Sequence, residues 1–119
     1  MIKNIFLVGL GGAMGSILRF LLQRLINTPI FPFGTLLINI GGCFLIGLLW
    51  GVIQKGFATE TIKFLLMTGF CGGFTTFSAF SFESMQMAQN QKWLLLFLYI
   101  TSSVAGGLLA TFGGYKITN

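Results

Sequence analysis

Long apolar stretches without a charged residue constrain the fold of this chain more than any other feature. Three of them are uninterrupted: Phe33 to Ile53, Phe64 to Phe82 and Trp93 to Tyr115. A fourth, from Ile5 to Leu25, carries charges only toward its end. Because a transmembrane helix needs about 20 mostly apolar residues, we predict an all-α membrane protein with four transmembrane helices, at about residues 4–26, 33–54, 61–88 and 93–116 of a single domain, 1–119.

The scarcity of charge excludes most other classes of protein. Only 8% of the 119 residues are charged, whereas a soluble domain usually carries about a quarter. The chain has no His, and its only acidic residues are Glu60 and Glu83, which removes the commonest metal ligand and most groups used in acid–base catalysis. The seven Lys and Arg are scattered singly, so nucleic acid is not an expected partner. We predict a multi-pass protein of the cell membrane, in contact with lipid, and not an enzyme.

Small residues recur at the spacing at which membrane helices pack closely. The chain contains three Gly-x-x-x-Gly pairs, Gly11 with Gly15, Gly47 with Gly51, and Gly69 with Gly73. Such pairs let two backbones approach to van der Waals contact in lipid. They predict tight helix packing and say nothing about function.

The basic residues leave the orientation of the chain in the membrane open. With four spans, Lys3, Lys55, Lys63 and Lys116 would lie near one side, and Arg19, Arg24 and Lys92 near the other. An excess of Lys and Arg normally orients a membrane protein, and here there is almost none. Either one or two residues decide a single orientation, or copies insert both ways. In the second case two opposed copies can form an antiparallel dimer with its two-fold axis in the membrane plane.

The third apolar stretch is a poor continuous helix. Gly72-Gly73 is followed closely by Thr75-Thr76, and Gly and β-branched residues are weak helix formers. We predict that this helix is broken at mid-membrane. A break frees backbone carbonyls, which must then be satisfied by protein, water or an ion, and discontinuous helices commonly mark ion sites. The alternative is a simple kink.

Two kinds of side chain inside the apolar stretches are candidates for an anion path. Asn39 and Thr35, four residues apart, share a helix face and offer N–H and O–H donors. Phe77 and Phe80 also share a face, and the positive edge of a phenyl ring favours an anion without a fixed counter-charge. The alternatives are a helix–helix hydrogen bond for Asn39 and packing or lipid contact for the rings.

Further candidates lie on the last span and at the ends of others. Tyr99 and Ser103 share a face. The serine hydroxyls of this span either bond the carbonyls of their own helix or extend a line of donors along an anion path. Arg19, near the end of the first span, would attract anions to a vestibule or else extend to the membrane interface. Glu83 lies at the end of the third span.

Together these stretches resemble the Fluc fluoride channels, also called the CrcB family. The matching stretches are Gly11-Gly12-Ala13-Met14-Gly15 with Arg19, the run from Gly34 to Gly41, and the run from Thr68 to Ser81. The resemblance extends over essentially the whole chain in length, number of helices and order of motifs. It implies antiparallel, dual-topology dimers with two pores.

The resemblance also implies roles for particular residues. Phenylalanines of the broken helix line each pore and match Phe77 and Phe80, and the pore asparagine matches Asn39. A structural, non-transported Na⁺ at the dimer centre would bind backbone carbonyls that match Gly72 and Thr75.

A polar track in the family matches Ser103 and Tyr99, with Thr35 on the face of the pore asparagine, and Glu83 matches a glutamate next to the pore. Two positions depart from the family pattern, Ala79 where Thr is usual and Gly107 where a second Ser is expected. Some members pair two non-identical subunits, so a homodimer and a heterodimer with a paralogue both remain open.

The function we predict is a fluoride-selective channel that lets cytoplasmic fluoride leave the cell and so lowers its toxicity. The main alternative is a proton-coupled exporter like the small multidrug-resistance proteins, which also have about this length and four helices. Those proteins need a carboxylate in the first helix, and here that segment has neither Asp nor Glu. A subunit that serves only packing or assembly is a third alternative.

Overall fold

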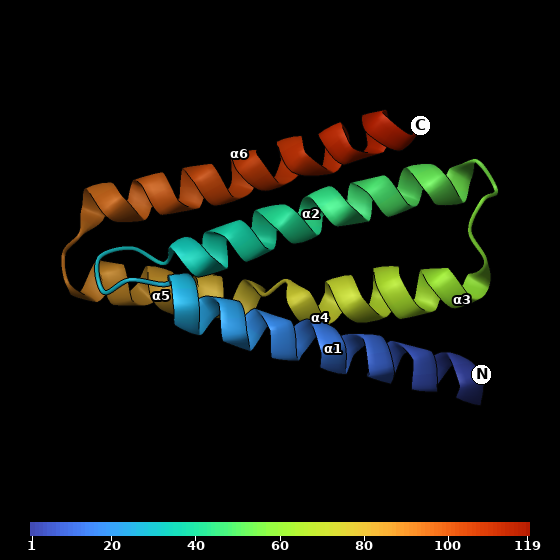
Figure 1. The fold of residues 1–119 in the computed structure, drawn as a ribbon. Helices are drawn as coiled ribbons and strands as arrows, with labels where there is room; N and C mark the ends of the chain where they lie inside the picture. Colours follow the sequence, from blue (N-terminus) through green and yellow to red (C-terminus); the bar gives the residue numbers. More distant parts are fainter.

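The computed structural model describes residues 1–119, and all of its regular elements are helical (Figure 1). Three spans are continuous helices: α1 (Ile2–Ile26), α2 (Phe33–Gln54) and α6 (Trp93–Thr118). The third is divided into α3 (Glu60–Ile62), the π-helix η1 (Lys63–Cys71), α4 (Gly72–Phe74) and α5 (Phe77–Gln89). Four spans are long and apolar enough to cross a membrane, which confirms the predicted all-α, four-span membrane protein.

The third span is interrupted where its glycines and threonines predicted a break. Thr75 and Thr76 have extended backbones, with φ −81° and ψ 154° at the first and φ −149° and ψ 117° at the second. Helix α5 begins directly afterwards because the Thr76 hydroxyl accepts a hydrogen bond from the Ala79 N–H at 3.1 Å, the usual contribution of Thr at a helix N-cap. The π-helix before the break was not predicted, and such wide helices often occur at functional sites.

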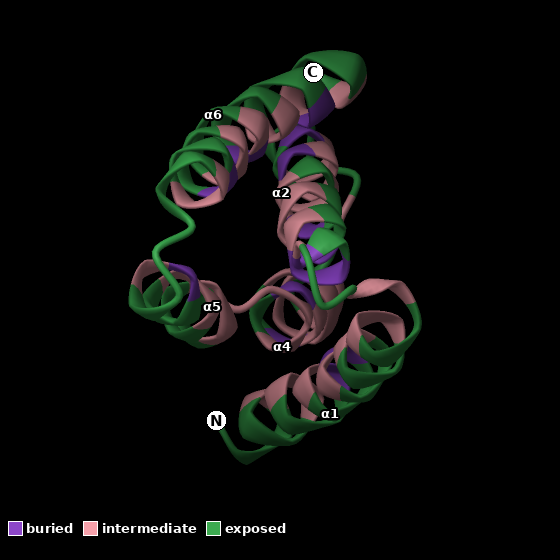
Figure 2. Cartoon of the chain, turned by 90° about the vertical axis from the view of Figure 1, so that its left-hand side faces the viewer, coloured by how far each residue is buried: buried purple, intermediate pink, exposed green.

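The spans pack in two close pairs, α2 against α6 and α1 against η1 and α4 (Figures 1 and 2). Glycines lie at both contacts. A methyl group on Gly47 would overlap the Thr111 carbonyl oxygen, and one on Gly15 would overlap that of Phe70. The predicted close approach of backbones at Gly-x-x-x-Gly pairs is therefore present in both pairs of helices.

Little of the chain is buried, and the buried residues lie on the inward faces of the helices (Figure 2). Only 15 of the 119 residues are buried, and large apolar side chains cover the outside. A water-soluble protein rarely exposes contiguous apolar surface on this scale. These outer faces suit contact with lipid or with another subunit, which agrees with a multi-pass membrane protein.

Candidate functional site

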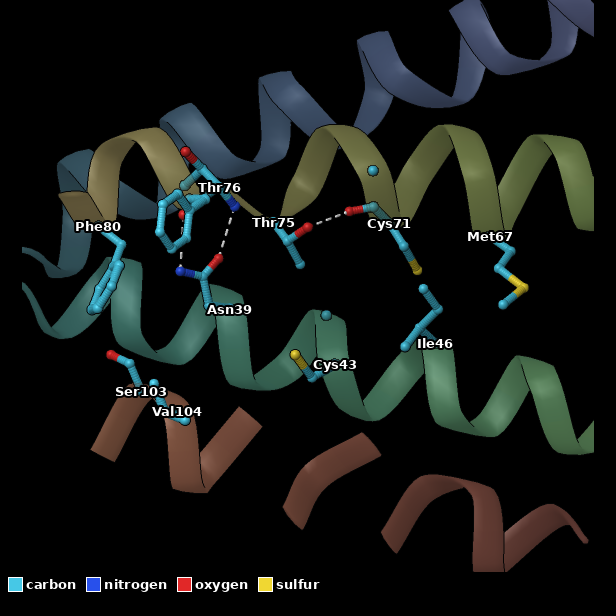
Figure 3. Close-up of a pocket in the computed structure, with 13 residues that line it drawn as sticks. Asn39, Cys43, Ile46, Met67, Cys71, Thr75, Thr76, Phe80, Ser103 and Val104 are labelled. Atoms are coloured by element: carbon cyan, nitrogen blue, oxygen red, sulfur yellow. Dashed lines mark hydrogen bonds between the residues drawn. The ribbon is translucent and has the colours of Figure 1, made fainter. Parts of the chain in front are cut away.

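The break in the third span is held open by a side chain from α2. Asn39 Nδ2 donates a hydrogen bond to the Thr76 carbonyl oxygen at 3.0 Å, and Asn39 Oδ1 accepts one from the Thr76 N–H at 2.8 Å (Figure 3). Backbone groups inside a membrane must be satisfied within the protein, and this amide does so for both polar groups of one extended residue. An Asn amide has two N–H donors, so the second donor of Asn39 is not needed for this contact.

The other side of the break is bound by α1. The carbonyl oxygen of Gly73 accepts hydrogen bonds from Arg19 Nε at 3.0 Å and from the Ser16 hydroxyl at 3.4 Å. Gly73 lies at the end of a helical stretch, where the dipole favours a positive charge. Arg19, predicted to attract anions to a vestibule, is thus placed against the broken helix, and a role for Ser16 was not predicted.

A cavity of about 360 Å³ opens beside the break, between α2, the third span and α6 (Figure 3). Six of the residues singled out from the sequence line it: Asn39, Gly72, Thr75, Phe77, Phe80 and Ser103. They come from spans that are far apart in sequence, so the fold brings together groups that sequence spacing alone could not connect. No charged side chain lines this cavity.

The hydroxyl of Ser103 distinguishes this cavity from ordinary helix packing. Ser103 Oγ is buried and has no hydrogen-bond partner. Its neighbour Ser102 instead donates to the Leu98 carbonyl oxygen of its own helix at 2.6 Å. An unpartnered buried hydroxyl is costly, and a group of this kind on a cavity wall is suited to bind a ligand.

The two phenyl rings of the candidate path differ in exposure. The centroids of Phe77 and Phe80 lie 5.6 Å apart, with the rings inclined at 50°. Phe80 is partly buried and lies 5.0 Å from the ring of Tyr99. Phe77 is 78% exposed, so in the single chain this ring has little cover.

The carbonyl-bearing residues Gly72 and Thr75 lie on the same cavity wall. A methyl group on Gly72 would meet nothing within 4 Å, which leaves that side of the backbone open. The Thr75 hydroxyl donates to the Cys71 carbonyl oxygen at 2.8 Å and so turns back onto its own helix (Figure 3). The chain has no group of three or more His, Cys, Asp or Glu side chains that could hold a metal.

The remaining predicted residues form a second polar group one helical turn away. The Glu83 carboxylate accepts hydrogen bonds from the Tyr99 hydroxyl at 2.8 Å, the Thr35 hydroxyl at 2.9 Å and Asn27 Nδ2 at 3.2 Å. Gln23 Nε2 also donates to Thr35 Oγ1, at 3.1 Å. Thr35 and Tyr99 are fully buried. Thr35 therefore binds Glu83 rather than lining the cavity beside Asn39.

Sequence reasoning did not identify Gln23 and Asn27 as part of the site. Both are polar and four residues apart: Gln23 lies in the last turn of α1, and Asn27 directly follows the helix. That spacing was the available signal. Their partners Thr35 and Glu83 are on other spans, so the contact itself depends on how the helices pack.

Comparisons with known proteins show which family the chain belongs to. Residues 6–115 match the family model described as CrcB-like protein, Camphor Resistance (CrcB). The protein named fluoride-specific ion channel FluC of Flavobacterium psychrophilum is 49% identical over 119 residues, which span 97% of this chain and 96% of the relative. The FluC proteins of Azobacteroides pseudotrichonymphae (44% identity, 99% and 98% of the two chains) and Leptospira interrogans (43%, 94% and 91%) are similar over almost the same length. The chain therefore belongs to the CrcB family.

Proposed function

We propose that this protein is a fluoride-selective ion channel that lets cytoplasmic fluoride leave the cell. Similar proteins that span almost the whole chain are named fluoride-specific ion channels, and a channel is not an enzyme. The observation that carries the proposal is the cavity at the break, where the unpartnered Ser103 hydroxyl, the Asn39 amide and two phenyl rings meet. The proton-coupled exporter is not favoured, because α1 contains no carboxylate.

In this proposal fluoride exchanges part of its water shell for fixed donors. Leaving a polar group unsatisfied in an apolar medium costs roughly 2–7 kcal/mol, so a small, strongly hydrated anion needs replacement donors along its path. The Ser103 hydroxyl and the second N–H of Asn39 supply them, and the ring edges of Phe77 and Phe80 add weaker attraction. The absence of charged side chains from the cavity wall suits conduction, because a conducted ion must leave as readily as it enters.

A second subunit completes the path in our proposal, as an antiparallel, dual-topology dimer. Phe77, one of the two rings, is 78% exposed in the single chain. A partner packed on this side would cover it and exclude lipid from the anion. The near balance of basic residues at the two ends of the spans supports insertion in both orientations. The partner is an identical chain or a paralogue.

We also propose that a structural Na⁺, which is not transported, binds the backbone oxygens of Gly72 and Thr75 and is required for function. Carbonyl oxygens are suitable ligands for hard cations. The open side of Gly72 leaves room for an ion, and the extended backbone at Thr75 turns peptide groups out of the helix. Bound sodium would supply positive charge to the carbonyl oxygens at the break.

The polar group around Glu83 extends the proposed path beyond the cavity. Tyr99 precedes Ser103 by one turn of α6, and its hydroxyl and that of Thr35 lie within hydrogen-bond distance of the Glu83 carboxylate. Arg19 has its Nε–H engaged by Gly73. Its charge would therefore stabilise the break as well as attract anions at the entrance.

Fluoride release from liposomes tests the proposal. The purified protein is reconstituted in vesicles loaded with potassium fluoride or potassium chloride, and release is followed with ion-selective electrodes after valinomycin is added. We expect rapid fluoride release and little chloride release. Protein-free vesicles are the control, and the absence of fluoride release from vesicles that contain folded protein would contradict the proposal.

A further inference from the structure

Helices α2 and α6 run in the same direction and pack in a regular register beside the cavity at the break (Figure 1). A methyl carbon on Gly107 would lie 3.4 Å from the sulfur atom of Cys43. One turn later in both helices, a methyl carbon on Gly47 would overlap the Thr111 carbonyl oxygen. The two contacts have the same offset in sequence, so successive turns of α2 face successive turns of α6.

The same register, followed one turn back, places Asn39 opposite Ser103, and both residues line the cavity. Residues four apart share a helix face, so Cys43 lies on the face of Asn39 and Gly107 on the face of Ser103. Cys43 also lines the cavity, whereas Gly107 has no side chain. In the turn that follows Asn39 and Ser103, the thiol is therefore the side-chain group of this pair that can meet an anion.

The thiol of Cys43 is suited to a weak contact with a passing ion. Cys43 is free and partly exposed, whereas the second cysteine, Cys71, is 1% exposed on the third span (Figure 3). An S–H group is a weak hydrogen-bond donor, and conduction requires contacts from which an ion can leave. The α2 wall of the cavity continues beyond Cys43 with Ile46, which has no polar side-chain group. The thiol is thus the last side-chain donor on this wall.

We propose that the Cys43 thiol is a donor on the anion path, one turn beyond the Asn39 amide and at the level where Gly107 leaves α6 without a side chain. This inference rests on the proposed fluoride channel and adds a residue to its path. The competing role for Cys43 is packing, in which the sulfur only fills the space beside Gly107, as expected for a cysteine that behaves as a small apolar side chain.

Moving the donor from one helix to the other separates these two roles. Cys43→Ala removes the S–H group and should slow fluoride release from liposomes several-fold. Combining Cys43→Ala with Gly107→Ser places a hydroxyl on α6 in the space that the sulfur vacates, and should restore most of the rate. A packing role predicts no such rescue, because the restored group is a donor on a different helix.

Chemical modification provides a second readout that needs no substitution at the path. The Cys43 thiol, after losing its proton to the buffer, attacks the sulfenyl sulfur of methyl methanethiosulfonate, forms a disulfide with the methylthio group and releases methanesulfinate. Labelling should block fluoride release by the unmodified protein and by Cys71→Ala, whereas Cys43→Ser should be insensitive to the reagent. Mass spectrometry follows the labelling of each cysteine, and excess fluoride should slow labelling of Cys43 more than excess chloride does.

Fluoride release at the normal rate by folded Cys43→Ala protein, or by protein fully labelled at Cys43, would overturn the inference and leave the sulfur with a packing role. If Cys43→Ala does not elute as a folded protein, the labelling experiment makes the same test on the unmodified chain. Release by the unlabelled, unmodified protein separates the two claims. Its absence defeats the proposed function, whereas release that is unaffected by labelling at Cys43 defeats only the inference.

Discussion

The two pairs of packed spans differ in how their backbone polar groups are hydrogen-bonded. Helices α2 and α6 are continuous, satisfy their backbones internally and meet through glycines such as Gly47 and Gly114. The third span, packed against α1, contains a π-helix and an extended break. Side chains from both neighbours, Asn39 on α2 and Arg19 on α1, bind its exposed backbone groups.

The continuous pair requires only close packing, whereas the broken span requires additional polar side chains. A continuous pair of helices in lipid needs only small residues and close contact. A broken span requires dedicated donors and acceptors, and is tolerated only where it is buried or lines a cavity. Five of the six predicted site residues on the cavity wall lie in the broken span or on the part of α2 that binds it, and only Ser103 comes from α6. The broken span, whose backbone groups need these additional partners, is also where the proposed ion path lies.

Replacing Asn39 should damage the broken region most. Asn39→Ala removes both hydrogen bonds to Thr76 and leaves an N–H and a carbonyl unsatisfied, at about 1–3 kcal/mol for each group. We expect a large loss of thermal stability in detergent and no fluoride release. Asn119→Ala, at the exposed C-terminal residue, is the matched control. A stable, conducting Asn39→Ala protein would show that the break needs no side chain from α2.

A substitution in the continuous pair should affect stability without affecting conduction. A methyl group at Gly47 would overlap the Thr111 carbonyl oxygen, and overpacking of this kind costs about 1–3 kcal/mol. Gly47→Ala should therefore lower the unfolding temperature, while the protein that remains folded still releases fluoride. At Gly113 a methyl group meets nothing within 4 Å, so Gly113→Ala should leave both properties unchanged. Equal effects on stability at the two positions would show that α2 and α6 do not depend on the close contact at Gly47. Loss of fluoride release from folded Gly47→Ala protein would remove the distinction between the pairs.

The smallest effect on stability, with a clear effect on function, is expected at Ser103. Its hydroxyl has no partner, so Ser103→Ala removes no hydrogen bond within the chain and should not lower the free energy of unfolding. Fluoride release should slow several-fold, because a donor is lost from the cavity wall. Ser102→Ala removes a hydroxyl that binds only its own helix, and the release rate should stay as it is. Identical rates in the two variants would exclude Ser103 from the path.

Much of the fold could be predicted from the sequence because it follows from local patterns. The four spans come from apolar runs of sufficient length, and the break from adjacent Gly and Thr residues with weak helix propensity. The close helix contacts follow from Gly-x-x-x-Gly spacing. The π-helix Lys63–Cys71 has no such signature in the sequence, and it was not predicted.

The sequence indicated which residues belong to the candidate site better than it indicated which residues contact each other. Residues such as Asn39, Phe80 and Ser103 stand out because polar and repeated aromatic groups are conspicuous in an apolar span. Which groups they bind depends on the register between spans, which spacing within one helix does not determine. For this reason the contacts of Thr35 with Glu83 and of Arg19 with Gly73 emerged only from the structure, together with the contribution of Asn27.

Fluoride release from liposomes by Phe80→Ile tests most directly whether the broken span lines the anion path. Phe80 lines the cavity at the break, whereas Phe97 on α6 is 65% exposed and serves as the matched control in Phe97→Ile. Isoleucine keeps the position apolar but removes the ring edge. The account predicts that Phe80→Ile abolishes release while Phe97→Ile conducts like the unmodified protein. Unchanged fluoride flux through folded Phe80→Ile protein would contradict it.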